Sequence, residues 1–301
     1  MNIECVGIIG LGEVGRILSE DLLAQSPVSV RVWDHEFGTA GSKAAKNLKT
    51  LAGDERLSVA ESAEEMSLGC QLLLSAVTAD QAVNAAQSIL PSLQCDTVFV
   101  DLNSVSPGAK QEISDLVEGA KGRFVEAAVM SPIMPLRSGS PMLLSGPNAG
   151  ETVSMLEFLG FHAVSVASED PGVASATKMC RSVIVKGMEA LVSESLLAAR
   201  HYGVEESVLG SLSNLFPGPD WPQHAQYLIS RTLLHGERRA AEMREVVNTV
   251  REAGCDPLMS AATVARQAWA AQFQAALDEE SLGEMLDAIR AASVCNEDER
   301  P

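Results

Sequence analysis

The chain has 301 residues, of which 46% are hydrophobic, and its formal net charge at pH 7 is −18. The length predicts about two domains, and the acidic balance argues against nucleic acid and anionic membrane surfaces as partners. No apolar run approaches the roughly 20 residues that span a bilayer, and no basic leader with a cleavage site precedes the first apolar run. We therefore expect a cytoplasmic protein without membrane contact.

Six cysteines are spread along the chain, at positions 5, 70, 95, 180, 255 and 295. They form no Cys-x-x-Cys pair, and none has zinc-ligand spacing with a histidine. This pattern predicts reduced, mostly buried thiols and no metal site.

The first 34 residues carry the strongest local pattern. The apolar run Val6–Ile9 is followed by Gly10-Leu11-Gly12-Glu13-Val14-Gly15, a helical pattern, a second apolar run at Val28–Trp33, and Asp34. This order is that of a dinucleotide-binding βαβ unit, in which the glycines permit a tight turn, the approach of a pyrophosphate and close helix packing. We expect the whole turn, from Gly10 to Gly15, to contact the cofactor at the positive end of the helix.

Asp34 indicates which dinucleotide binds. It lies 19 residues beyond Gly15, where a carboxylate accepts hydrogen bonds from the adenosine ribose and repels a 2′-phosphate. The sequence therefore favours NAD over NADP.

Residues 1–167 alternate short apolar runs with helical patterns. This alternation predicts an α/β domain with an open, doubly wound, mostly parallel Rossmann-type sheet. The expected strands cover residues 4–9, 28–33, 56–59, 71–77, 96–101, 123–127, 141–145 and 161–166. Ligands of such sheets bind beyond the carboxyl ends of the strands. That rule points to the turn at Gly10 and to the loops at Val77–Thr78, Asn103–Ser104 and Val129–Met130, with Val77, Thr78 and Asn103 expected near the cofactor.

Residues 168–301 show no convincing strand and predict an all-helical domain for substrate binding and dimerisation. Ser168–Pro171 is typical of a helix start, with Asp170 as the N-cap and Pro171 in the first turn. Helical patterns cover 172–216, 222–235, 237–253 and 257–277. We expect the active site in the cleft between the two domains.

A dehydrogenase needs a group that takes the proton of the substrate hydroxyl. None of the five histidines is well placed: His35 directly follows Asp34, His162 opens an expected strand, and the other three are scattered over the helical half. Lys178 is therefore the better candidate. It lies two turns into the helix at the domain junction, and Ser182 shares its face. The alternative is an ordinary surface lysine on an amphipathic helix.

The order of these segments resembles the β-hydroxyacid dehydrogenase family, which includes 3-hydroxyisobutyrate dehydrogenase and 6-phosphogluconate dehydrogenase. The similar segments are the glycine turn, Asp101–Pro107 (family pattern D-x-S-T-x-x-P), Glu126–Pro132 (family D-A-P-V-S-G-G) and Gly172–Ser182 (family G-x-x-x-x-x-K-x-x-N-N). The chain is most similar to the branch with a phosphogluconate-dehydrogenase-like helical C-terminal domain. The resemblance implies that Lys178 is catalytic, that Ser104 lies beside the nicotinamide, and that helical domains interlock in a homodimer or homotetramer.

The departures from the family pattern concern the substrate. Met130 replaces a substrate-binding serine, and Ser131-Pro132 replaces two glycines, which removes one backbone donor. The two asparagines after the lysine are here Arg181 and Ser182. Ser182 can donate to a substrate hydroxyl, and Arg181 either clamps an anionic group or forms a structural ion pair.

The sequence thus predicts a nicotinamide-dependent dehydrogenase or reductase for a small anionic hydroxy acid, or for its semialdehyde or keto form. Ser104, Met130, Ser131, Arg181 and Ser182 are the expected substrate contacts, although Asn103, Ser104 and Thr78 are also placed to cap helices. Two alternatives stay open: an imine or keto-acid reductase, and a non-catalytic NAD-binding sensor.

Overall fold

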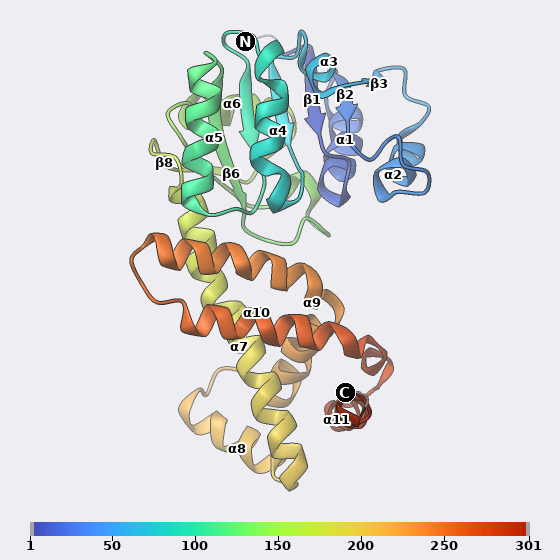
Figure 1. Cartoon of the computed structure of the whole chain (residues 1–301), viewed down its shortest axis with the longest axis vertical. Helices are drawn as coiled ribbons and strands as arrows, with labels where there is room; N and C mark the ends of the chain where they lie inside the picture. Colours follow the sequence, from blue (N-terminus) through green and yellow to red (C-terminus); the bar gives the residue numbers. More distant parts are fainter. Residues whose placement is uncertain (1–2, 299–301) are drawn as a thin grey trace. The chain divides into compact units, whose positions relative to one another are not determined.

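The computed structural model describes residues 3–298, apart from the side chains of 215 and 294–298. Its contacts divide the chain into two compact units, Met1–Met179 and Cys180–Pro301. The first unit is a sheet covered by helices, drawn from blue to yellow-green in Figure 1, and the second is built from helices.

The sheet of the first unit has eight strands in the order β3-β2-β1-β4-β5-β6-β7-β8, and only the β6–β7 pairing is antiparallel. The strands are β1 (Cys5–Ile9), β2 (Ser29–Trp33), β3 (Leu57–Val59), β4 (Leu72–Ser75), β5 (Val98–Asp101), β6 (Arg123–Val129), β7 (Met142–Ser145) and β8 (Val164–Ser168). The predicted doubly wound, mostly parallel sheet is confirmed. Strand order reverses between β1 and β4, the position at which ligands bind in such sheets.

Two hydrophobic clusters explain why the central strands are continuously apolar. Leu72 and Leu74 pack into one cluster with α1 (Glu13–Gln25), α2 (Lys43–Leu51) and α6 (Ala149–Phe158). Leu73 and Phe99 pack on the opposite face with α3 (Ala63–Ser67), α4 (Ala82–Ile89) and α5 (Pro107–Gly119). Because alternate side chains of a strand point to opposite faces, both sets must be apolar.

The thiols are less buried than the sequence predicts. Cys5 is half-buried and Cys70 buried, whereas Cys95, Cys180 and Cys255 are exposed. Cys95 lies in a turn before β5, and Cys255 follows the end of a helix. The apolar residues next to them in the sequence therefore do not bury these thiols. The side chain of Cys295 lies outside the described residues.

The helices that follow the sheet are α7 (Val173–Tyr202), α8 (Glu205–Leu215), α9 (Trp221–Glu252), α10 (Leu258–Ala270), the 3-10 helix η4 (Ala271–Asp278) and α11 (Leu282–Asp298). Described residues 173–298 contain no strand, as predicted. The predicted break between 235 and 237 is wrong, because α9 continues through Gly236. A Cβ there would lie 2.4 Å from the carbonyl oxygen of Gln267 on α10, so the glycine serves close helix packing.

The start of α7 also differs from the prediction. Strand β8 extends to Ser168, and Gly172 has a φ of +93°, so the helix begins at Val173 and not at Pro171. Its first turn is capped by a buried carboxylate of the sheet: Glu126 on β6 accepts hydrogen bonds from the backbone N–H groups of Gly172 and Ser175, both at 2.6 Å. This cap fixes the first turns of α7 to the sheet.

Replacing Glu126 with glutamine tests the importance of this cap. Glu126→Gln removes the negative charge and one acceptor while two backbone N–H groups stay buried, which predicts a loss of about 2–3 kcal/mol of unfolding free energy. Urea denaturation of the full chain measures this loss, with the exposed Glu157→Gln on α6 as the matched control. Equal stability of the two variants would contradict the capping role.

Candidate functional site

The glycine turn between β1 and α1 leaves open space at one position only. Gly10 has a φ of +92°, and a Cβ there would lie 2.5 Å from the carbonyl oxygen of Ala76. A Cβ on Gly15 would lie 1.9 Å from the carbonyl oxygen of Gly10, whereas one on Gly12 would meet no atom within 4 Å. Gly10 and Gly15 are therefore required by the fold, and Gly12 leaves room for a ligand to approach the backbone.

The start of α1 offers backbone donors beside that space. Gly12 is the N-cap residue, and no side chain caps the helix. Asn47 on α2 donates to the carbonyl oxygens of Leu11 (2.8 Å) and Gly12 (3.0 Å), which holds the carbonyl side of the turn. The first N–H groups, at Glu13 and Val14, carry the positive end of the helix dipole, which suits a phosphate. Sequence reasoning missed Asn47 because a single asparagine in a helix gives no signal of its distant partner.

Asp34 is anchored to the same turn. Its Oδ2 accepts from the backbone N–H of Leu11 at 2.7 Å, and its Oδ1 accepts from that of Glu36 at 2.8 Å. Leu11 therefore donates to Asp34 in this structure. Each carboxylate oxygen keeps a second lone pair, so the side chain is still able to accept a ribose hydroxyl.

A cavity of about 180 Å³ lies beside Asp34 at the carboxyl end of the sheet. It is lined by Ile9, Gly10, Trp33, Asp34, His35, Val77, Gln81, Asn84, Ala85 and Ser88. Val77 thus shares a cavity with Gly10 and Asp34. Thr78 is exposed and is not part of this lining; its side chain hydrogen-bonds Asp80 and holds the pKa of that carboxyl below its usual range.

Asn103 is buried, and its side chain makes hydrogen bonds within the protein. Its Oδ1 accepts from the backbone N–H of Val77 at 2.7 Å, and its Nδ2 donates to Ser75 at 2.8 Å and to Asp101. Asp101 forms a fully buried ion pair with Lys110 at 2.7 Å. We assign Asn103 a positioning role, because it ties the loop after β4 to the loop after β5. The cap of α5 is Ser106, not Asn103 or Ser104.

Lys178 and Ser104 meet at the end of this second loop. The Nζ of Lys178 donates to the Oγ of Ser104 at 2.7 Å, although the two residues are 74 positions apart. Lys178 is half-buried on the capped first turns of α7, and Ser104 follows the loop anchored by Asp101. An amine beside a hydroxyl is able to exchange a proton with an oxygen placed against both.

Met130 and Ser131 lie in the segment after β6. The backbone N–H of Met130 donates to the carbonyl oxygen of Pro141 at 2.8 Å, and the hydroxyl of Ser131 donates to that of Pro132 at 3.1 Å. These two hydrogen bonds hold the segment after β6 in place, and the role of Met130 and Ser131 in substrate binding stays a prediction.

Arg181 and Ser182 belong to the second unit. Arg181 is exposed, and the hydroxyl of Ser182 accepts from Lys186 at 3.4 Å. Lys186 in turn pairs with Glu242 at 2.6 Å. Ser182 is therefore part of a polar network within the helices.

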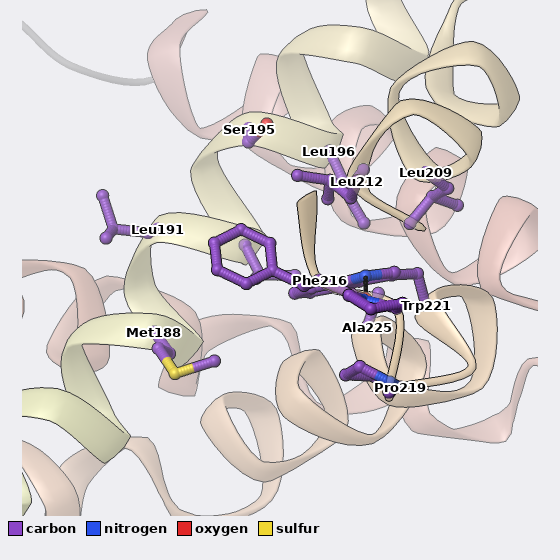
Figure 2. Close-up of a pocket in the computed structure, with 13 residues that line it drawn as sticks. Met188, Leu191, Ser195, Leu196, Leu209, Leu212, Phe216, Pro219, Trp221 and Ala225 are labelled. Atoms are coloured by element: carbon purple, nitrogen blue, oxygen red, sulfur yellow. Dashed lines mark hydrogen bonds between the residues drawn. The ribbon is translucent and has the colours of Figure 1, made fainter. Parts of the chain in front are cut away.

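The second unit contains a larger cavity of about 660 Å³ (Figure 2). It is lined by Met188, Leu191, Val192, Ser195, Leu196, Leu209, Leu212, Phe216, Pro217, Gly218, Pro219, Trp221 and Ala225. None of these side chains is charged, and the indole N–H of Trp221 donates to the carbonyl oxygen of Phe216 at 3.2 Å. Apart from the hydroxyl of Ser195 and this indole, the side chains of the lining are apolar.

The helices of residues 3–298 include no candidate for a membrane-spanning segment. The same residues also contain no group of three or more metal-ligating side chains.

The strand order, the glycine turn and the anchored acid define a dinucleotide-binding Rossmann domain, here followed by an all-helical unit. The chain belongs to the family described as the NAD binding domain of 6-phosphogluconate dehydrogenase, which matches residues 5–159. Residues 199–270 match a domain of unknown function, DUF1932. The family resemblance drawn from the sequence is confirmed, and a nicotinamide cofactor follows at the family level.

Individual proteins agree with this assignment. The chain is 30% identical to a conserved hypothetical protein from Sinorhizobium meliloti 1021, with a TM-score of 0.78 over 96% of this chain and 97% of that one. It is 22% identical to human mitochondrial 3-hydroxyisobutyrate dehydrogenase over 72% of this chain and 63% of that enzyme. The fold is also that of a Mycobacterium tuberculosis 3-hydroxyisobutyrate dehydrogenase (TM-score 0.68, 18% identity, 97% of this chain and 99% of that chain).

The two glycines of the turn provide a matched pair of variants. Gly12→Ala places a methyl group in open space, so we expect a loss of no more than about 1 kcal/mol in unfolding free energy but a loss of at least about 10-fold in NADH affinity. Gly15→Ala must displace the backbone of Gly10, so we expect a large loss of stability. Thermal unfolding and NADH fluorescence titration measure both. Unchanged NADH affinity in Gly12→Ala would place the phosphates elsewhere.

Proposed function

We propose that this protein is an NAD-dependent dehydrogenase or reductase, acting on a small anionic hydroxy acid or on its semialdehyde or keto form. The observation that carries the proposal is the 2.7 Å contact between Lys178 and Ser104, at the carboxyl end of a sheet whose glycine turn fits a dinucleotide. Membership of a nicotinamide-binding family supports it. The anionic substrate is proposed from the similarity to hydroxyacid dehydrogenases, among them human mitochondrial 3-hydroxyisobutyrate dehydrogenase.

The roles of the residues follow from the protons that each can hold. The nicotinamide, when bound, accepts or supplies the hydride. In the oxidative direction the neutral amine of Lys178 takes the proton of the substrate hydroxyl as the carbonyl forms, and in the reductive direction the ammonium returns it. Ser104 accepts an N–H of Lys178, which orients the amine, and its own hydroxyl is free to donate to the substrate oxygen.

Removal of the amine tests this role. We expect Lys178→Met to lower kcat by roughly 10²–10⁴-fold, the usual contribution of a general acid or base, while the Kd for NADH stays within about twofold. A panel of hydroxy acids and their keto and semialdehyde forms, assayed with NAD and NADP, measures this. Lys49→Met, at an exposed position on α2, is the control.

Each other outcome of that assay favours a different function. Retained turnover in Lys178→Met would remove the lysine from the chemistry. Turnover confined to imines would indicate an imine reductase, because reduction of a protonated imine needs no comparable proton donor to oxygen. Tight NADH binding without turnover of any substrate would indicate a sensor.

The choice of NAD depends on Asp34. Its buried carboxylate is held in place by the N–H groups of Leu11 and Glu36, so it cannot turn away from a 2′-phosphate. We expect the Kd for NADH to be at least about 10-fold lower than that for NADPH. The repulsion between the Asp34 carboxylate and the 2′-phosphate, with no cation between them, costs more than about 1.4 kcal/mol. Fluorescence titration of the wild type and of Asp34→Asn measures the preference, which should narrow in the variant. An equal affinity of the wild type for both cofactors would contradict the assignment.

A further inference from the structure

Two thiols that are distant in sequence meet at the amino end of the sheet. The Sγ atoms of Cys5 and Cys70 lie 2.8 Å apart, and the residues are 65 positions apart in the chain. Cys5 begins β1, and Cys70 lies two residues before β4, the strand paired with β1. A disulfide bond has an S–S length of about 2.05 Å, so closure requires a movement of less than about 1 Å.

The two thiols differ in access to solvent. Cys5 is half-buried, whereas Cys70 is 1% exposed and packs into the apolar cluster with Met66. A small oxidant dissolved in water therefore reaches Cys5 more readily than Cys70. Cys70 is placed to react only with its neighbour.

The hydrogen bonds of the pair prepare Cys5 for reaction. The Cys70 thiol has a single proton and two acceptors, the carbonyl oxygen of Met66 at 3.3 Å and the sulfur of Cys5. When Cys5 is ionised, this proton turns to the Cys5 thiolate. Donation from Cys70, aided by the positive charge of Arg31 and opposed by burial, lowers the pKa of Cys5 to about 6.

Cys70 behaves in the opposite way. Its contact with Cys5 and its burial raise the pKa of Cys70 well above the usual range, so it keeps its proton. A thiolate that solvent can reach, beside a protonated and buried second thiol, is the arrangement of redox-reactive cysteine pairs.

We propose that Cys5 and Cys70 form a peroxide-reactive modification site, in which Cys5 is the attacking thiol and Cys70 the resolving one. The Cys5 sulfur attacks one oxygen of hydrogen peroxide; the S–O bond forms, the O–O bond breaks, and hydroxide leaves and takes up a proton. The Cys70 sulfur then displaces the new hydroxyl, so that the S–S bond forms and water leaves with the Cys70 proton. Two electrons pass from the thiols to the peroxide, and two waters are formed.

The site is separate from the proposed active site. Cys5 lies at the first residue of β1, and the glycine turn follows the last residue, at the opposite end of the strand. The disulfide would join the starts of two central strands and close a long loop of the unfolded chain. We therefore expect an increase in Tm of about 5 °C or more and an NADH affinity changed by less than about twofold.

Treatment of the full chain with a few equivalents of hydrogen peroxide tests the proposal. Peptide mapping without reductant should show Cys5 linked to Cys70, and dithiothreitol should reverse the link. Cys70→Ser should instead accumulate a Cys5 sulfenic acid that dimedone traps. Cys5→Ser should leave Cys70 unmodified, and the control Cys95→Ser should still form the link.

A second measurement applies if the serine variants do not fold. The rate of iodoacetamide reaction at Cys5 in the wild type should rise with pH and level off above about pH 7, because only the thiolate reacts. The proposal is wrong if the Cys5–Cys70 link is missing after Cys95, Cys180 and Cys255 have been oxidised. It is equally wrong if the pH at which Cys5 reacts with iodoacetamide at half its maximal rate lies above 8. Neither result depends on the dehydrogenase activity.

Discussion

The site depends on one buried carboxylate, that of Glu126. It lies on β6 with no exposed surface and accepts two short hydrogen bonds from the first turn of α7. The negative charge also faces the positive end of that helix dipole. Lys178 lies three residues after Ser175, whose N–H is one of the two donors. The contact between Lys178 and Ser104 therefore exists because Glu126 fixes where α7 begins.

Two other carboxylates hold the loops that meet Lys178 and the glycine turn. Asp101 pairs with Lys110 and orients Asn103, which in turn holds the backbone of Val77. Asp34 accepts from the backbone of Leu11. Buried charges are costly unless they are paired and hydrogen-bonded. Each of these carboxylates has its partners inside the first unit, and together they hold the loops around the glycine turn.

The sequence predicted the features that depend on local pattern. The eight strands, the glycine turn and the helical second half follow from apolar spacing and glycine positions, which neighbouring residues determine. The start of α7 and the continuity of α9 could not be predicted, because they depend on a carboxylate from β6 and on a close approach between Gly236 and α10. The partners of the Asn103 side chain, Asp101 and Ser75, could not be predicted either, because no spacing rule reveals them.

The charge of the chain limits how an anionic ligand can be attracted. With a formal net charge of −18, the protein repels anions at long range. Attraction must then come from short-range donors, and the first unit supplies two kinds: the uncapped N–H groups of α1 and the amine of Lys178. Both lie at the carboxyl end of the sheet, and the carboxylates of Asp34, Asp101 and Glu126 each accept hydrogen bonds from donors inside the first unit. The proposed function therefore requires the N–H groups of α1 and the amine of Lys178 to bind phosphate and carboxylate within a strongly acidic molecule.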